Sequence, residues 1–474
     1  MLSPPVAEYL RSHQPQHLER LKELLRIPSI ANVRDRQPDG CKMAAEWLAA
    51  HMNALGLESR VLPAAGKPNV FAEGRAGAGL PTVLIYGHYD VQPPDPLELW
   101  LSPPFEPVVR DGALYARGAS DDKGQLFAML CAVEAWQRAG RHGAQTGGRM
   151  ADSTGAGGLP VNVKVFLEGE EEIGSPHLEP FLAEHAALLK ADAIIVSDSG
   201  FFAPGVPSIT YALRGLVYFE ITLVGPSADL HSGQRGGVVA NPINALARML
   251  AGMTDEHGRV TIPGFYDDVL EISPQERAAW SRLPFDEGAL AAELGVPALA
   301  GGEKGFSVLE RNWARPTLDA NGIVGGYTAP GAKTVIPSRA SAKISCRLVP
   351  AQEPEKVLAG VRQYLAEHAP AGCTVSLQVH TQARPVLLSQ DAPGMKEAQA
   401  ALEEAFGARP ILVRNGASVP ITELFQRLLG TDAVLMGFGL PNDSIHSPNE
   451  RMVLEQFYRG AVAGAALLQN LRGM

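Results

Sequence analysis

The stretch TVLIYGHYDVQP at residues 82–93 joins an apolar run to two polar residues, His88 and Asp90, that follow it at once. A short continuous apolar run is typical of a strand buried on both faces of a parallel sheet. In open α/β sheets, ligands bind outside the carboxyl ends of such strands. The stretch therefore predicts a sheet strand that carries His88 and Asp90 to a ligand site.

Further segments repeat this arrangement of an apolar run followed by His, Asp or Glu. They are VKVFLEG before Glu170, Glu171 and Glu172, AIIVS before Asp198, LYARGAS before Asp121 and Asp122, and AVLMGFGLPNDSI before His446. Taken singly, each has an ordinary explanation, such as a surface histidine, an acidic loop, a helix N-cap or a turn. Their recurrence at strand ends favours convergence on one metal site, and His and carboxylate ligands without thiols suit Zn²⁺, Mn²⁺ or Co²⁺.

The wider pattern predicts an α/β fold with a mixed, mostly parallel sheet flanked by helices. Apolar runs alternate with helical periodicity, which is clear near 43–55, over about 124–138 and near 454–471, and Gly56 suits the residue after a helix end. VYFEITLV at 217–224 and SAKISCRLV at 341–349 instead alternate apolar with polar residues, as in strands with one solvated face.

These textures predict two domains. Residues 1–212 and 385–474 would form a discontinuous catalytic domain, and residues 213–384 an inserted α+β domain. The segment 141–160 is rich in Gly, Ser and Thr and predicts a mobile surface loop.

Composition narrows the classes of protein. The 474 residues carry 41 Lys and Arg against 51 Asp and Glu, a formal net charge of −10, which argues against a nucleic-acid partner. The four cysteines are widely spread, so neither a disulfide framework nor a thiolate zinc site is expected. No secretory signal pattern and no apolar run of about 18 residues is present, which predicts a cytoplasmic protein without a membrane partner.

Several motifs together resemble the dinuclear zinc amidohydrolases, the family of cytosolic nonspecific dipeptidase, carnosinase, carboxypeptidase G and acetylornithine deacetylase. The motifs are GHYDVQPPDPLELWLSPPF, LYARGASDDKGQ, EGEEEIGS, SDSG, DLHSG and HSPNE. The stretches RPTLDANGIVGGYTAPGAKTVIP and SAKISCRLVP are most similar to the metallo-dipeptidase branch. The resemblance implies a zinc-peptidase-like catalytic domain and makes the inserted domain a lid and dimerisation domain.

The resemblance also implies a role for each matching residue in a site that binds two divalent ions, most simply zinc, with Mn²⁺ or Co²⁺ as alternatives. His88 and Asp198 would bind one ion, Glu172 and His446 the other, and Asp121 both. Asp90 would orient the His88 ring. Glu171 would be the general base that activates a metal-bridging hydroxide. The residues alone leave Glu170, Glu171 and Glu172 ambiguous, and the family's Glu-Glu-x-Gly-Ser register selects Glu171.

The remaining roles concern the substrate, a small peptide with a free C-terminal carboxylate. By resemblance, His231 would donate to the developing oxyanion in the partner subunit of a homodimer, and Arg347 would bind the substrate carboxylate. Thr334 and Ser418 match positions that hydrogen-bond the peptide. Two alternatives stay open: an amidohydrolase acting on N-acyl or N-carbamoyl amino acids, and a metal-free binding protein.

Overall fold

The computed structural model describes residues 1–32, 39–145, 158–417 and 419–474. The chain forms two compact units. The first comprises Met1–Tyr211, Leu388–Val413 and Val419–Met474, and the second comprises Ala212–Leu387 and Arg414–Ser418. The second unit thus takes in a short return segment at 414–418 that the sequence-based boundaries leave in the first.

A mixed sheet forms the centre of the first unit. Among the described residues it has nine strands in the order β1-β2-β6-β3-β7-β17-β8-β15, with β16 paired to β8. The pairs β6–β3, β3–β7 and β7–β17 are parallel, and the outer pairs are antiparallel. The predicted mixed sheet is therefore confirmed, although its parallel pairing is limited to the four central strands β6, β3, β7 and β17. The strands are β1 (Glu58–Leu62), β2 (Asn69–Gly74), β3 (Thr82–His88), β6 (Asn162–Glu168), β7 (Ala193–Val196), β8 (Ser208–Leu213), β15 (Val386–Leu387), β16 (Ile411–Asn415) and β17 (Ala433–Leu435).

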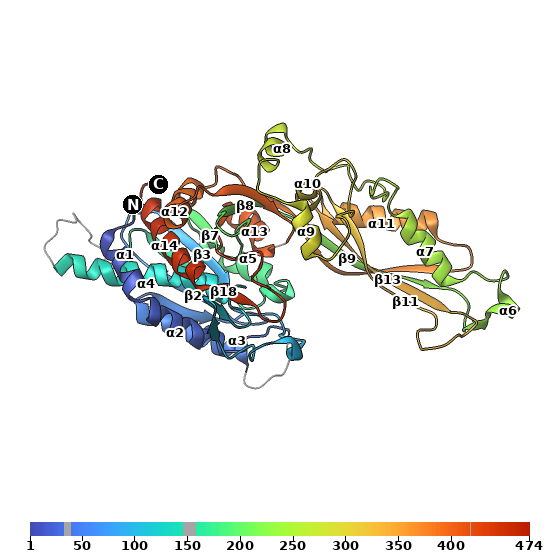
Figure 1. Cartoon of the computed structure of the whole chain (residues 1–474), viewed down its shortest axis with the longest axis horizontal. Coiled ribbons are helices and arrows are strands. Elements are labelled where there is room, and N and C mark those ends of the chain that lie inside the picture. The colour runs from blue at the N-terminus through green and yellow to red at the C-terminus, as the bar shows by residue number, and fades with distance from the viewer. Residues whose placement is uncertain (33–38, 146–157, 418) are drawn as a thin grey trace. The chain divides into compact units, whose positions relative to one another are not determined.

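Helices cover both faces of this sheet (Figure 1). Side chains of β3 alternate between the faces: Val83 and Ile85 pack in the core under α4, whereas Tyr86 packs edge-on against Phe425 on the opposite face. The helices of the first unit are α1 (Pro4–Ser12), α2 (Gln14–Leu25), α3 (Gly40–Leu55), α4 (Lys123–Gln145), α5 (Leu178–Leu189), α12 (Met395–Phe406), α13 (Pro420–Leu424) and α14 (Leu454–Leu471), with the short turns η1 (Leu97–Leu99), η2 (Glu171–Ile173) and η3 (Phe425–Leu429).

The helix boundaries test two expectations. Helix α3 ends at Leu55, and Gly56 follows it with a φ of 92°, as predicted. Helix α4 continues to Gln145, so the prediction of a loop over 141–160 is wrong for residues 141–145. Gly140 and Gly143 weaken a helix by about 1 kcal/mol each but need not end it. The rest of that loop, residues 146–157, lies outside the described residues.

The first unit also contains a small antiparallel sheet. It consists of β4 (Val108–Arg110), β5 (Ala113–Tyr115) and β18 (Arg451–Val453), in the order β18-β5-β4. It joins the segment before Asp121 to the segment after His446, which are more than 300 residues apart in the chain.

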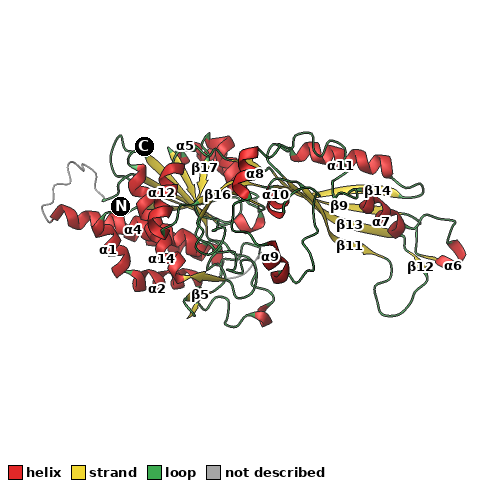
Figure 2. Cartoon of the chain, turned by 45° about the horizontal axis from the view of Figure 1, so that its top comes forward, coloured by secondary structure: helices red, strands yellow, loops and turns green. Residues whose placement is uncertain are grey.

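The second unit is an α+β domain built on a four-stranded antiparallel sheet in the order β11-β13-β9-β14 (Figure 2). Every second residue of β9 is buried, which confirms the strand expected at 217–224, and β13 confirms the one at 341–349. Helices α7 and α11 pack on the buried face. The elements are β9 (Gly215–Val224), β10 (Leu230–His231), β11 (Thr317–Gly325), β12 (Val335–Ile336), β13 (Arg339–Leu348), β14 (Thr374–Ala383), α6 (Ser232–Arg235), α7 (Pro242–Gly252), α8 (Pro274–Trp280), α9 (Glu287–Glu293), α10 (Val308–Trp313) and α11 (Pro354–His368).

Over the described ranges, none of the helices is both long enough and apolar enough to cross a membrane.

Candidate metal centre

Four adjacent parallel strands, β6, β3, β7 and β17, deliver the candidate ligands to one edge of the sheet. His88 is the last residue of β3, Asp198 follows β7, Glu172 lies in the turn after β6, and His446 lies in the loop after β17. Asp121 comes from the loop between β5 and α4. The geometry follows from the parallel pairing, because the carboxyl ends of these strands all point the same way.

The five residues form two groups that share one carboxylate. In the first group, His88 Nε2 lies 3.1 Å from Asp121 Oδ1 and 3.8 Å from Asp198 Oδ2. In the second, His446 Nε2 lies 2.9 Å from Asp121 Oδ2 and 3.1 Å from Glu172 Oε2. Within each group the ligand atoms lie within 4.8 Å of one another, which is close enough to hold one cation. Asp121 uses a different oxygen toward each group.

Asp90 supports both His88 and the glutamate turn. The buried His88 ring has Nδ1 3.1 Å from the backbone oxygen of Asp90 and 3.5 Å from its Oδ1, which leaves Nε2 facing the site. The Asp90 carboxylate also accepts hydrogen bonds from the backbone N–H groups of Glu171 and Glu172, at 3.2 and 3.0 Å. One buried side chain therefore orients residues on two neighbouring strand ends.

The structure separates the three adjacent glutamates by their partners. Glu170 lies 2.8 Å from His177 Nδ1 and accepts a hydrogen bond from the backbone N–H of Lys67 at 3.1 Å. Glu172 accepts a hydrogen bond from Gln92 Nε2 at 2.8 Å and faces His446. The Glu171 carboxyl group interacts electrostatically with the ligand-cluster residues His88, Asp198 and Glu172.

The loop that carries His446 has an unusual backbone. Ser444, His446 and Asn449 adopt φ values of 55°, 59° and 63°, a left-handed conformation that is uncommon for residues other than glycine. Asn449 fastens the loop by accepting from Leu101 N and donating to Leu99 O, at 2.8 and 2.9 Å. Local strain of this kind clusters at functional sites.

The carboxylates of the cluster outnumber its cationic groups. Burial raises the pKa of Asp198 to about 7, opposed by His88 and reinforced by Asp121 and Glu172. Burial also raises the pKa of Glu171 well above its usual range, opposed by His88 and reinforced by Asp198. For Asp121, burial opposes ionisation, but hydrogen bonds from His446 and His88 hold its pKa below the usual range.

The two histidines show the reverse effect. Hydrogen bonds to Asp121 and Glu172 raise the pKa of His446 to about 10. The pKa of His88 is also raised, because hydrogen bonds to Asp121 and Asp90 outweigh its burial. The four carboxyl groups of Asp121, Glu171, Glu172 and Asp198 therefore outnumber the two imidazole rings. This donor set fits divalent cations, whose charge would let the carboxyl groups ionise together.

Two further residues, Gln92 and Glu450, hold parts of the ligand cluster in place and were not predicted from the sequence. Gln92 holds Glu172 by donating to its Oε2 and, at 3.2 Å, to its backbone oxygen. Glu450, four residues after His446, accepts hydrogen bonds from the loop that carries Asp121. Gln92 lies in the motif YGHYDVQP and Glu450 in HSPNE, each four residues after a predicted histidine ligand. This closeness in sequence to a ligand was the only sign in these motifs that they could belong to the site.

The other predicted site residues belong to the second unit. His231 in β10 pairs with Val335 in β12, next to Thr334, whose backbone oxygen accepts from Ser232 N at 3.0 Å. His231 Nδ1 accepts from Gly233 N at 3.0 Å, so Nε2 carries the proton of the neutral ring. Arg347 lies in β13. Ser418 is outside the described residues.

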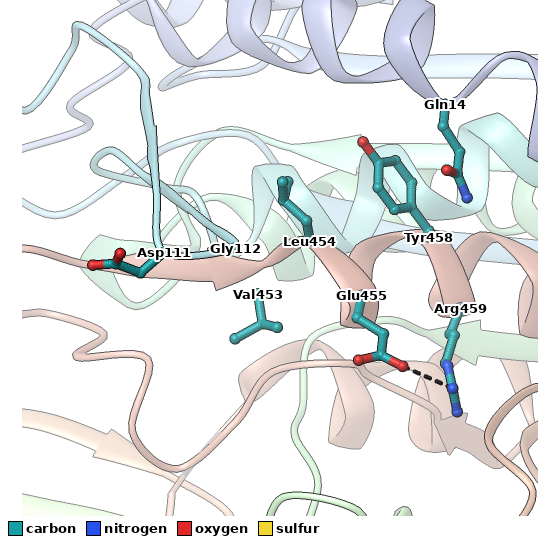
Figure 3. Close-up of a pocket in the computed structure, with 8 residues that line it drawn as sticks. All are labelled: Gln14, Asp111, Gly112, Val453, Leu454, Glu455, Tyr458 and Arg459. Carbon is teal, nitrogen blue, oxygen red and sulfur yellow. Dashed lines mark ion pairs between the residues drawn. The ribbon is translucent and has the colours of Figure 1, made fainter.

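A separate cavity of about 570 Å³ lies at the start of α14 (Figure 3). Glu455 and Arg459 form an ion pair of 2.7 Å on its wall. None of the predicted site residues lines it. Its lining consists of Gln14, Asp111, Gly112, Val453, Leu454, Glu455, Tyr458 and Arg459.

Comparison with known proteins agrees with this architecture. Residues 84–146 match Peptidase family M20/M25/M40, and residues 211–373 match the Peptidase dimerisation domain. The chain is 31% identical to the Cys-Gly metallodipeptidase of Saccharomyces cerevisiae over 98% of this chain and 97% of that protein. It is 29% identical to the human Beta-Ala-His dipeptidase, over 99% of this chain and 94% of that protein.

A solved structure shows the same arrangement of elements. The M20 family metallo-carboxypeptidase Sso-CP2 from Sulfolobus solfataricus superposes with a TM-score of 0.83 at 33% identity, over 97% of this chain and all of that one. The expected α/β catalytic domain with an inserted dimerisation domain is therefore confirmed. The chain belongs to the M20/M25/M40 peptidase family and is a metal-dependent hydrolase.

Proposed function

We propose that this protein is a two-metal dipeptidase that cleaves the peptide bond of dipeptides or short peptides with a free C-terminal carboxylate. The observation that carries the proposal is the pair of His and carboxylate groups that share Asp121. The similarity to Cys-Gly and Beta-Ala-His dipeptidases over nearly the whole chain supports dipeptides as the substrate class.

In this proposal each group of ligands holds one divalent cation. His88 and Asp198 hold the first, Glu172 and His446 hold the second, and Asp121 contacts both. Zinc suits tetrahedral His and carboxylate sites, and Mn²⁺ and Co²⁺ are the alternatives. When bound, the two cations would lower the pKa of a water molecule toward about 7 and polarise the carbonyl of the scissile bond.

Glu171 is the proposed general base. Its backbone N–H is held by Asp90, and its carboxylate lies in the electrostatic environment of the ligands. It takes a proton from the attacking water and returns it to the amine of the departing residue. Glu170 is unsuited to this role because it is engaged with His177 and Lys67.

Residues of the second unit bind the substrate in this proposal. His231, with its proton on Nε2, donates to the developing oxyanion of the partner subunit's substrate, which requires a homodimer. Arg347 binds the substrate carboxylate, and Thr334 and Ser418 hydrogen-bond the peptide. The four cysteines are unpaired, which suits a reducing compartment such as the cytoplasm.

The experiment is turnover by metal-free protein after separate addition of Zn²⁺, Mn²⁺ and Co²⁺. A panel of dipeptides is compared with their C-terminal amides and with N-acetyl and N-carbamoyl amino acids. We expect metal-dependent hydrolysis of dipeptides and slow hydrolysis of the amides. Faster hydrolysis of the N-acyl or N-carbamoyl compounds would make the protein an amidohydrolase, and turnover without metal would refute the two-metal mechanism.

A further inference from the structure

Glu450 is a fully buried carboxylate that accepts four hydrogen bonds. Its Oε1 accepts from the backbone N–H groups of Ser120 and Asp121, at 2.9 and 3.0 Å. Its Oε2 accepts from the backbone N–H of Gly118 at 2.9 Å and from Arg117 Nη1 at 2.8 Å. A buried charge is tolerated only when it is paired and hydrogen-bonded, and Arg117 supplies the opposite charge.

These bonds join two ligand-bearing loops that are distant in the sequence. Glu450 lies four residues after His446, whereas its acceptor oxygens hold residues 118–121. Another hydrogen bond also joins the two loops, because Ser120 Oγ donates to Asp443 Oδ2 at 2.9 Å. The backbone oxygen of Glu450 also accepts from Ala116 N at 3.1 Å.

The consequence falls on Asp121, the carboxylate shared by both ligand groups. Glu450 accepts a hydrogen bond from the backbone N–H of Asp121 and so fixes its backbone. The two side-chain oxygens of Asp121 meanwhile face His88 and His446, at 3.1 and 2.9 Å. A carboxylate that contacts two cations must hold both oxygens in place at once. Freeing its backbone would let it turn toward one group at the expense of the other.

We propose that Glu450 is a positioning residue that fixes Asp121 in the orientation needed to bind two cations together. This inference rests on the proposed two-metal site. It differs from a general stabilising role in one measurable respect, because it predicts a loss of metal affinity beyond any loss of stability.

The second unit offers a matched control. Glu303 is also a buried carboxylate, 7% exposed, and it binds Arg315 through two hydrogen bonds of 2.6 and 3.1 Å. It accepts a third from Arg259 at 3.1 Å. Glu303→Gln and Glu450→Gln therefore remove the same kind of buried ion pair, but only Glu450 contacts a ligand-bearing loop.

The test is a titration of the metal-free protein with Co²⁺. Calorimetry measures the affinity for the ion, and the visible absorption of bound Co²⁺ reports its coordination. For Glu450→Gln we expect a loss of about 10- to 100-fold in affinity for at least one ion, which is typical when a group that supports a ligand is removed. For Glu303→Gln we expect wild-type affinity and an unchanged absorption spectrum. Thermal unfolding of both variants measures the stability that each loses.

Each outcome bears on the inference. Wild-type Co²⁺ affinity in Glu450→Gln, or an equal loss in Glu303→Gln, would overturn it while leaving the two-metal site intact. Wild-type protein that binds no Co²⁺ would overturn the proposed site and this inference together. If Glu450→Gln does not fold, Glu450→Asp keeps the charge beside Arg117 but shortens the side chain, and wild-type affinity in that variant would also overturn the inference.

Discussion

Replacing Glu171 with Gln removes the proposed general base while keeping the size of the side chain. We expect metal content to stay at the wild-type level, because the two groups of ligand atoms do not include Glu171. The backbone N–H of Glu171 is held by Asp90, so the turn keeps its shape. The variant therefore isolates proton transfer from metal binding.

The size of the effect follows from the chemistry. General acid–base catalysis by a positioned side chain contributes about 10²- to 10⁴-fold. At about 1.36 kcal/mol for each factor of ten, this corresponds to about 3–5 kcal/mol of activation free energy. The loss should fall on kcat, because a proton acceptor acts in the transition state rather than in substrate binding.

Glu170→Gln is the control, and it should show the opposite behaviour. Glu170 pairs with His177, whose side chain is 43% exposed, so the loss of this charge should cost about 1 kcal/mol of stability after solvent screening. Its kcat should stay within a few-fold of wild type. The assay measures kcat and KM on one dipeptide, metal content by elemental analysis, and unfolding in urea. If Glu171→Gln kept more than about a tenth of wild-type kcat, or Glu170→Gln lost activity with its metal retained, the assignment of the base would be wrong.

Other predictions address the metals, the dimer and the acid stability of the first unit. Asp198→Asn should lower the affinity of one ion and leave the other, and elemental analysis after limited dialysis should find fewer than two ions per chain. Mixing His231→Ala with Glu171→Gln in subunits that exchange should restore about a quarter of wild-type activity if His231 acts in the partner's site, and none if it acts in its own. Each bound ion, at about 100 times its Kd, should stabilise the fold by about 2.7 kcal/mol, measured by unfolding with and without chelator; an unchanged midpoint would contradict metal binding to the native state. Burial lowers the pKa of His51 to about 4 from 6.5, so the unfolded chain binds more protons between these values. Stability should therefore fall as pH drops below 6.5, by about 2 kcal/mol at pH 5, and His51→Phe, which keeps the stacking on Trp47, should flatten this fall in urea titrations.

Several features of the fold and site could be predicted because they depend on short segments. An apolar run such as 82–86 reports burial on both faces, and the residue after it must lie at the carboxyl edge of the sheet. This reasoning predicts that His88, Asp198 and His446 lie at one edge of the sheet, and all three follow or end parallel strands of that sheet. The loop predicted from composition was wrong over residues 141–145, which are helical. A Gly-rich composition lowers helix propensity without deciding where a packed helix ends.

Other features could not be read from segments, because they depend on contacts across the chain. Gln92 acts through Glu172, which is 80 residues away, and Glu450 acts through a loop about 330 residues away. Neither side chain has a local pattern that distinguishes it from an ordinary polar residue in a motif. A hydrogen bond of this range is specified by the packing of whole strands and loops.

The sequence by itself determined the class of sheet, the inserted domain and the kind of chemistry, since periodicity and ligand type are local properties of the chain. The tertiary structure alone decided how the carboxylates divide their work. It turned the two oxygens of Asp121 toward different histidines, engaged Glu170 with His177, and left Glu171 beside the ligands. The physical reason is that hydrogen bonds and charge interactions change within an ångström or two, a scale that only the folded chain defines.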